Sequence, residues 1–272
     1  MKPDRQYRDV EFEPSEIRHE YGSNVHILRD PLALTELARL CSPELGQPRF
    51  NRVIASLYRR LLWNVANAEL PRKQASIPSR MSESTDRGIY RGEVIDPEVS
   101  IVTVDIARGG IIPSDVCYSE LNDLMDPNFI RQDHVFMSRV TDEDGNVTGA
   151  EIVGEKVGGS IDGRHLIIPD PMGATGSSMS RAVSYYREEV EGLPERVIAM
   201  NLIVTPEYIR RMTSDHPDVQ LYALRLDRGM SPDEVLDTVP GEQWERESGL
   251  DAHDYIVPGG GGFGELMNNS WD

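Results

Sequence analysis

The residues best suited to chemistry lie where a short apolar run meets small and hydroxyl-bearing residues. Residues 166–168, Leu-Ile-Ile, are typical of a buried strand that ends at Pro169, because proline cannot continue the hydrogen-bonded ladder. Apolar residues at three- and four-residue steps then predict an amphipathic helix over 177–191, whose unpaired first amides and dipole would form an anion site. Asp170, at the carboxyl end of the strand, could accept hydrogen bonds from sugar hydroxyls. This pattern predicts a site for a phosphorylated sugar.

A simpler interpretation of the same stretch stays open. Asp170 and Pro171 could form only a turn, and Ser177 could only cap the helix, since turns and caps use the same residue types. Two other phosphate motifs do not apply. The segment 173–178 lacks the Gly-Lys-Ser/Thr ending of a P-loop, and the G-x-G-x-x-G match at 259–264 lies eight residues from the end of the sequence, so no βαβ unit follows it.

Composition and charge restrict the class of protein. The 272 residues are 39% hydrophobic and 27% charged, as in a globular protein of one large domain. A net charge of -18 argues against a nucleic-acid partner. No apolar stretch approaches the roughly 20 residues that span a bilayer, so no membrane partner is expected. The charged first residues carry no apolar signal, which favours a cytoplasmic location, and the isolated Cys41 and Cys117 are expected to be small buried side chains.

The order of elements predicts an α/β fold. Residues 1–22 are polar without periodicity and are expected to be an N-terminal extension to a domain over 23–272. Helical spacing follows over 31–41 and 50–70, then a polar connection over 72–87. Strands and helices alternate after that, with Thr205 as a helix cap before Pro206. The expected strands are 101–106, 134–140, 152–157, 165–168, 197–204 and 220–226, and the expected helices between them are 113–125, 177–191 and 206–214.

Two of these strands are predicted to form a hairpin. The segment between them, 141–146, contains Asp-Gly, which favours a tight turn. Arg139 and Lys156 would then lie on the two arms of the hairpin. Such an arm could fold over a site, although exposed cations are more commonly just solvated.

Four short motifs occur in one order over residues 100–265. The segment 170–178 is similar to D-P-M-L-A-T-G-G-S at seven of nine positions, and 106–110 resembles I-L-R-A-G. Residues 216–219 and 255–259 match H-P-D-V and Y-I-V-P-G. The chain thus resembles the uracil phosphoribosyltransferases, as a divergent member. The resemblance implies a type I phosphoribosyltransferase fold: a central, mostly parallel sheet flanked by helices, with a β-hairpin arm and N-terminal helices.

The resemblance also implies an activity. Members of this family transfer phosphoribose from phosphoribosyl pyrophosphate to uracil, giving UMP and pyrophosphate in pyrimidine salvage. Such a displacement needs positioning and charge stabilisation rather than a protein nucleophile. The resemblance further implies Mg²⁺ carried by the pyrophosphate, without dedicated protein ligands, and a homodimer or larger homo-oligomer. Transfer to another base, or a non-catalytic sensor or regulator with this fold, are the alternatives.

Residue roles follow from the matched motifs. Arg108 and Asp170 would be the catalytic residues. Tyr255 and Ile256 would help bind uracil, although Tyr255 could instead pack in the core, and Lys156 falls at a family lysine position. The residues that would bind phosphoribosyl pyrophosphate are Arg108, Gly109, Arg139, Asp170, Pro171, Met172, Gly173, Ala174, Thr175, Gly176, Ser177 and Ser178, and those that would bind uracil are Tyr255, Ile256, Gly261, Gly262 and Phe263.

Three departures from the family bear on function. The family continues Y-I-V-P-G with L-G-D-A-G-D, whereas here Gly262 stands at the first aspartate and Phe263 at the small residue beside the base. A lost carboxylate could weaken binding of the metal or ribose, and a phenyl ring could fill the pocket. Asp105 stands where a proline is usual. An insertion over 231–250 begins like a helix at residues 231–234, with Pro232 at the first helical position, and could be a lid, an oligomer contact or a passive excursion.

Overall fold

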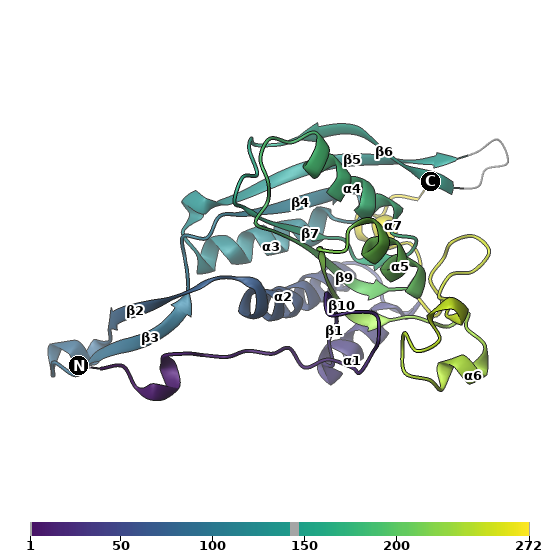
Figure 1. Cartoon of the computed structure of the whole chain (residues 1–272). Coiled ribbons are helices and arrows are strands. Elements are labelled where there is room, and N and C mark those ends of the chain that lie inside the picture. The colour runs from purple at the N-terminus through teal and green to yellow at the C-terminus, as the bar shows by residue number, and fades with distance from the viewer. Residues whose placement is uncertain (1, 142–146, 272) are drawn as a thin grey trace.

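One twisted sheet organises the protein (Figure 1). The computed structural model describes residues 2–141 and 147–271, without the side chains of 139–141 and 147–148. Neighbouring strands run parallel, except for the antiparallel β5–β6 pair. In spatial order the strands are β1 (Val25–Ile27), β10 (Gln220–Leu226), β9 (Arg196–Val204), β7 (His165–Pro169), β4 (Ile101–Ala107), β5 (Ile130–Thr141) and β6 (Val147–Lys156), with the short β8 (Met172–Gly173) beside β9.

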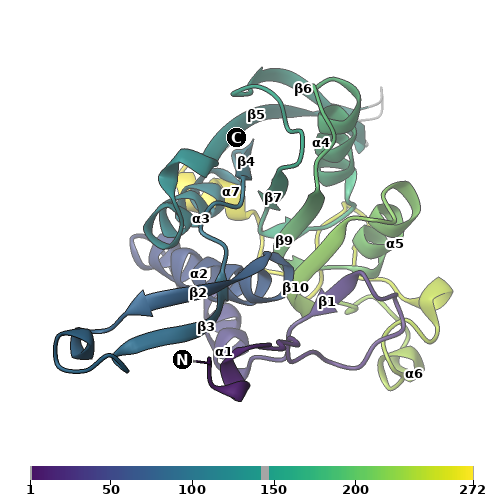
Figure 2. The same cartoon turned by 60° about the vertical axis from the view of Figure 1, so that its left-hand side comes forward.

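Helices cover both faces of this sheet, which is why its central strands are continuous apolar runs (Figures 1 and 2). One face packs in a core with α1 (Pro31–Leu40), α2 (Arg49–Glu69), α3 (Ile111–Leu124) and α7 (Phe263–Asn268). The other packs with α4 (Ser177–Glu188) and α5 (Pro206–Asp215). The predicted α/β class, the six strands and the five helices are therefore confirmed, with ends shifted by a few residues.

Two local predictions about helix starts have different outcomes. Thr205 caps α5 as predicted, accepting a hydrogen bond from the Tyr208 amide at 3.0 Å, with Pro206 at the first position. In the insertion, α6 (Asp233–Leu236) begins one residue after Pro232, which takes the cap position itself. The insertion also contains a 3-10 turn, Trp244–Arg246.

The polar connection expected over 72–87 is wrong. Strands β2 (Arg72–Pro78) and β3 (Ile89–Ile95) pair antiparallel and project from the body, with a 3-10 turn, Arg80–Glu83, between them (Figure 2). Most of these side chains are at least partly exposed, so no alternation of apolar and polar residues marks the strands. Backbone pairing defines this hairpin.

The N-terminal residues follow this hairpin and then the edge of the main sheet. The Val10 amide donates to Glu93 Oε2 at 2.8 Å, close to a 3-10 turn over Arg5–Tyr7. Further along, the Ile17 amide donates to the Ile27 carbonyl at 3.0 Å, and Tyr21 is buried. The last part of the expected extension thus packs on the domain.

The two cysteines differ in burial: Cys117 is buried as predicted, whereas Cys41 is only half-buried.

One more short element completes the described structure, a 3-10 turn over Pro127–Phe129 that leads into β5. Among the described residues there is no helix of sufficient length and apolarity to cross a membrane.

Candidate active site

A cavity of about 670 Å³ opens at the carboxyl ends of β4 and β7. This volume suits a small molecule, and the crevice outside the carboxyl ends of parallel strands is where such folds bind ligands. Single residues of the β5–β6 hairpin, Met137, Ser138 and Gly149, border it, together with Tyr208 of α5. Its main walls are residues 106–109, 170–172, 174–179, 253–256 and 261–265. Three of the four motif segments therefore meet around one space.

The loop that leads into α4 leaves the helix N-terminus open. Gly176 is the N-cap residue, with φ of +79°, a backbone conformation that suits glycine. It offers no side-chain cap, so the interpretation of Ser177 as a simple N-cap is wrong: Ser177 is the first helical residue. Thr175 Oγ1 accepts from the Ser177 amide at 3.3 Å and lies 3.0 Å from Ser177 Oγ. Hydroxyls and the amides of the first helical turn thus gather where an anion would bind.

Gly173 lies behind the cavity wall and not among the lining residues. A Cβ on it would lie 2.9 Å from the Tyr208 ring and 3.0 Å from Val204 Cγ1. A side chain at this position would therefore push α5 away from the sheet. The contact explains why this position of the loop carries glycine.

Asp170 stands at the end of β7, partly buried and facing the cavity. Burial raises its pKa to about 6, against the opposing hydrogen bond from the Met172 amide, and the charge of Asp105 adds to the rise. Asp105 lies in the neighbouring strand β4, two residues before its end, with Oδ2 hydrogen-bonded to His134 Nδ1 at 3.0 Å. Burial raises the pKa of Asp105 too, although His134 opposes the shift. Two carboxyl groups with raised pKa values thus lie near the carboxyl ends of adjacent strands.

Arg108 faces the same cavity from the loop after β4, where it follows a cis peptide bond. Its Nη2 lies 3.5 Å from Glu265 Oε1, and its Nη1 donates to Ser270 Oγ at 3.0 Å. The guanidinium is held by the C-terminal segment at the rim of the cavity.

The glycine run continues into a helix that sequence analysis did not predict, α7. This helix has six residues and includes a glycine, so its helical signal is weak. A Cβ on Gly262 would overlap Oε2 of Glu265 and lie 3.0 Å from its Cδ. The Glu265 carboxylate therefore occupies the space beside the position where the family has its aspartate. The sequence could reveal this only with α7 assigned, because residues three apart become neighbours in the first turn of a helix.

Phe263 does not fill the cavity with its ring. The side chain is buried, and the ring packs edge-on against Phe50 of α2, with centroids 5.2 Å apart. Gly260 makes room for it, since a Cβ there would lie 2.6 Å from the Phe263 ring. The ring anchors α7 in the core, so the departure at this position alters packing more than it alters the space for a ligand.

The segment before the glycine run supplies the remaining wall. Tyr255 is 54% exposed, so the alternative of core packing is wrong for it, whereas Ile256 is 8% exposed. His253 and Asp254 also line the cavity. Their position next to the Y-I-V-P-G motif is the one signal that could have pointed to them.

The structure describes the side chain of only one of the two cations expected on the hairpin, Lys156. Arg139 lies in β5, paired with Ala150, but its side chain is outside the described part of the chain. Lys156 is exposed at the end of β6, opposite His134, and does not line the cavity. The hairpin itself borders the cavity as predicted.

Comparison with known proteins adds the family. A family model described as uracil phosphoribosyltransferase matches residues 27–242. The uracil phosphoribosyltransferase of Dictyoglomus thermophilum is 26% identical over 243 residues, which cover 89% of this chain and 98% of that protein. The one of Caldanaerobacter subterraneus subsp. tengcongensis is 34% identical over 112 residues, or 41% and 42% of the two chains. The solved AQ2163 protein from Aquifex aeolicus has a TM-score of 0.67 at 17% identity, over 89% of this chain and 97% of that chain.

The parallel sheet, its hairpin and the cavity at the strand ends form the type I phosphoribosyltransferase fold. The sequence match over 27–242 is more specific than the fold. The chain belongs to the uracil phosphoribosyltransferase family.

Proposed function

We propose that this enzyme transfers phosphoribose from phosphoribosyl pyrophosphate to N1 of uracil, giving UMP and pyrophosphate. The observation that carries the proposal is the meeting of the 170–179 loop, the Arg108 loop and the 253–265 segment around one cavity. These are the parts that such a reaction needs: a phosphate cradle, a cation for the leaving group and a wall for the base.

Each part has a chemical task in the proposal. The open N-terminus of α4 binds the 5-phosphate through amides and the hydroxyls of Thr175 and Ser177. Ionised Asp170 accepts hydrogen bonds from the ribose hydroxyls. Arg108 binds the pyrophosphate, with Gly109 beside it. The exposed Tyr255 and the main chain of Gly261 and Gly262 border the base.

The reaction then depends on positioning and charge. The bond between ribose C1 and a pyrophosphate oxygen breaks, a bond from uracil N1 to C1 forms, and the N1 proton is released. Positive charge develops on the ribose and negative charge on the leaving group, so the Asp170 carboxylate and the Arg108 guanidinium stabilise opposite ends of the transition state. The cavity walls hold the base next to ribose C1, and this proximity further increases the rate of the reaction.

A magnesium ion fits the donor atoms of the cavity. Asp170 and Glu265 both line it and offer carboxylate oxygens, the ligand type that Mg²⁺ prefers. When bound with the pyrophosphate, the ion would neutralise charge on the leaving group. Either carboxylate could add a protein ligand to an ion carried by the pyrophosphate, with substrate oxygens and water as its other ligands.

A homo-oligomer belongs to the proposal as well. The β2–β3 hairpin projects from the body and exposes apolar side chains: Ile77 is 49% exposed, Met81 58% and Tyr90 37%. Exposed apolar side chains on a projecting arm suit contact with a second copy of the chain. Sedimentation analysis of the purified protein tests this part independently of activity.

Pyrophosphate release with a panel of purine and pyrimidine bases tests the activity. Turnover with uracil, and little with the other bases, would support the proposal. If uracil is inert while another base turns over, the acceptor is wrong, which is the alternative motivated by Gly262. Thermal stabilisation by phosphoribosyl pyrophosphate with Mg²⁺, without turnover of any base, would favour a sensor.

A further inference from the structure

An arginine outside the loop motif touches the phosphate cradle. Arg211 lies on α5, and its Nη1 donates a hydrogen bond to Ser177 Oγ at the start of α4. The helices α4 and α5 lie side by side (Figures 1 and 2), so residues 34 positions apart in the sequence meet there. Ser177 Oγ is also 3.0 Å from Thr175 Oγ1. One hydroxyl thus links the arginine to the cradle.

The stem of Arg211 packs over the turn of the cradle. A Cβ on Gly176 would lie 3.3 Å from Arg211 Cδ, 3.4 Å from its Cβ and 3.5 Å from its Cγ. The side chain therefore covers the outer side of the loop, and its guanidinium ends at Ser177. This packing restricts the arginine to the neighbourhood of the anion site although the residue is exposed.

The charge of Arg211 is not neutralised by a neighbouring acid. Within residues 2–141 and 147–271, no carboxylate lies within ion-pair distance of its guanidinium, in a chain with a net charge of -18. The cradle residues 170–178 contain no lysine or arginine. Arg211 therefore adds positive charge to a site that otherwise offers amides and hydroxyls.

We propose that Arg211 is a positioning residue for the 5-phosphate of phosphoribosyl pyrophosphate. It orients the Ser177 hydroxyl and adds a cation at the N-terminus of α4, where a phosphate monoester of charge about -1.5 to -2 would lie. Arginine suits this role because its charge is permanent and its planar group can donate to the Ser177 hydroxyl from a fixed orientation. The inference rests on the proposed function, since it assigns the phosphate end of that substrate to this loop.

Titration calorimetry with two probes measures binding at the 5-phosphate end and at the pyrophosphate end of the site separately. Ribose 5-phosphate contains the phosphate that Arg211 would serve, whereas pyrophosphate belongs at Arg108. In Arg211→Ala, the Kd for ribose 5-phosphate should rise about tenfold, the loss expected for one charged contact, while the Kd for pyrophosphate stays unchanged. Arg211→Lys should recover part of the affinity. Arg181→Ala on α4 is the matched control, because Arg181 pairs with Glu189 at 3.2 Å.

Steady-state kinetics at several salt concentrations provide a second test of the role of Arg211. The KM for phosphoribosyl pyrophosphate should rise about tenfold in Arg211→Ala while kcat changes little, since the phosphate is remote from the reacting bond. The difference from wild type should shrink as salt rises, because the charge is exposed. Adding Ser177→Ala should cost less in Arg211→Ala than in wild type, as expected for a coupled pair.

The outcomes separate the inference from the function on which it rests. If wild type binds both probes and Arg211→Ala binds them equally well, Arg211 has no role although the proposed function stands. If Arg211→Ala loses both probes to the same degree, the residue acts only on the fold. If wild type binds neither probe, the proposed function fails and takes the inference with it.

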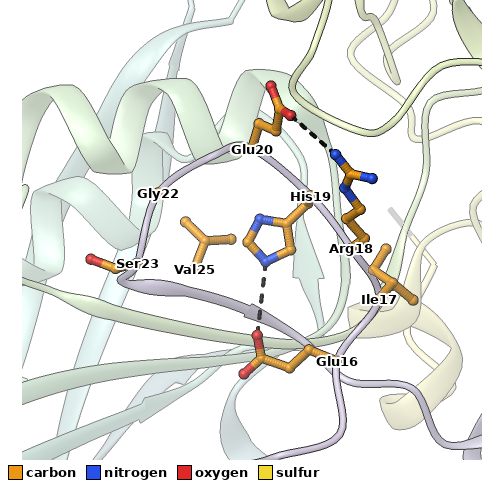
Figure 3. Close-up of a pocket in the computed structure, with 8 residues that line it drawn as sticks. All are labelled: Glu16, Ile17, Arg18, His19, Glu20, Gly22, Ser23 and Val25. Atoms are coloured by element: carbon orange, nitrogen blue, oxygen red, sulfur yellow. Dashed lines mark ion pairs between the residues drawn. The ribbon is translucent and has the colours of Figure 1, made fainter.

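Another hollow, of about 480 Å³, lies along the edge strand β1 and is lined by residues 16–20, 22, 23 and 25 (Figure 3). Glu16 lies 3.9 Å from His19, and Arg18 lies 3.9 Å from Glu20, while the other oxygen of Glu16 lies 2.7 Å from His26 Nδ1. No inference is drawn from this hollow.

Discussion

The carboxylate of Glu265 faces the guanidinium of Arg108, with 3.5 Å between Oε1 and Nη2. The acid lies in the first turn of α7 and the arginine in the loop after β4, so the C-terminal helix meets the loop proposed to bind pyrophosphate. A Cβ on Gly264 would lie 3.8 Å from the Gly109 amide, which confirms how closely the two segments approach. An anion at Arg108 has to share the guanidinium with Glu265 or displace it.

Glu265→Gln should strengthen the binding of pyrophosphate. The substitution keeps the shape of the side chain but removes a negative charge that competes for Arg108. Both side chains are about one-third exposed, so solvent screens the pair and the gain should be modest, about three- to tenfold in Kd. Titration calorimetry with pyrophosphate measures it. Unchanged or weaker binding would show that the carboxylate does not compete at this site.

Arg108→Ala should reduce kcat/KM at least about 100-fold, since the leaving pyrophosphate would lose its cation. The fold should survive, because the guanidinium lies at a cavity rim and not in the core. Melting temperature and circular dichroism check that point, and Arg108→Lys should retain part of the rate. A folded Arg108→Ala enzyme with normal activity would remove this residue from the pyrophosphate site.

Gly262→Asp should not raise activity, although it restores the family residue. The new carboxylate would lie beside that of Glu265, and two like charges would then compete for one space. We expect a several-fold loss in kcat/KM. Gly262→Ala is the control for bulk alone and should be close to neutral, because a flexible Glu265 can rotate away.

The double variant Gly262→Asp with Glu265→Gly makes room for the new acid. It should recover the activity that Gly262→Asp loses, if one carboxylate at this place is what the reaction needs. A clear gain from Gly262→Asp alone would contradict this account and show that Glu265 does not take the place of the missing aspartate.

Ionisation of the Asp170 carboxyl group should lower the stability of the fold, although the proposed reaction needs the ionised form. Burial raises its pKa to about 6, above the value of about 3.9 in an unfolded chain. The folded state therefore binds the proton more tightly, and stability falls as pH rises from about 4 to about 6. Asp170→Asn should be more stable than wild type at pH 7, by about 1–2 kcal/mol, and should lose this advantage below about pH 4.

Activity should depend on pH in the opposite sense. The ionised carboxylate accepts hydrogen bonds from the ribose, so kcat/KM should rise as pH increases through about 6, and Asp170→Asn should be nearly inactive throughout. Denaturant titrations and rate profiles over pH 4–8 supply both curves. An active Asp170→Asn enzyme, or a stability difference independent of pH, would argue against these roles.

The sequence by itself determined the α/β class and the segments of the cavity. Residues 166–168 and the helix after them are local patterns, in which apolar spacing and the loop residues carry the information within one stretch of chain. The same holds for the cap of α5 at Thr205. The motif at 170–178 could likewise be predicted to bind a phosphate, because its glycine and hydroxyl residues lie within one short loop.

Only the tertiary structure decided which side chains meet. The β2–β3 hairpin escaped prediction because backbone pairing, and not an apolar pattern, defines it. The inward turn of Phe263 depends on space beside Phe50 in α2. Glu265 reaches Arg108 because α7 packs beside the loop after β4, and Arg211 reaches Ser177 because α4 and α5 pack side by side. Such contacts follow from the packing of whole elements, which no local spacing records.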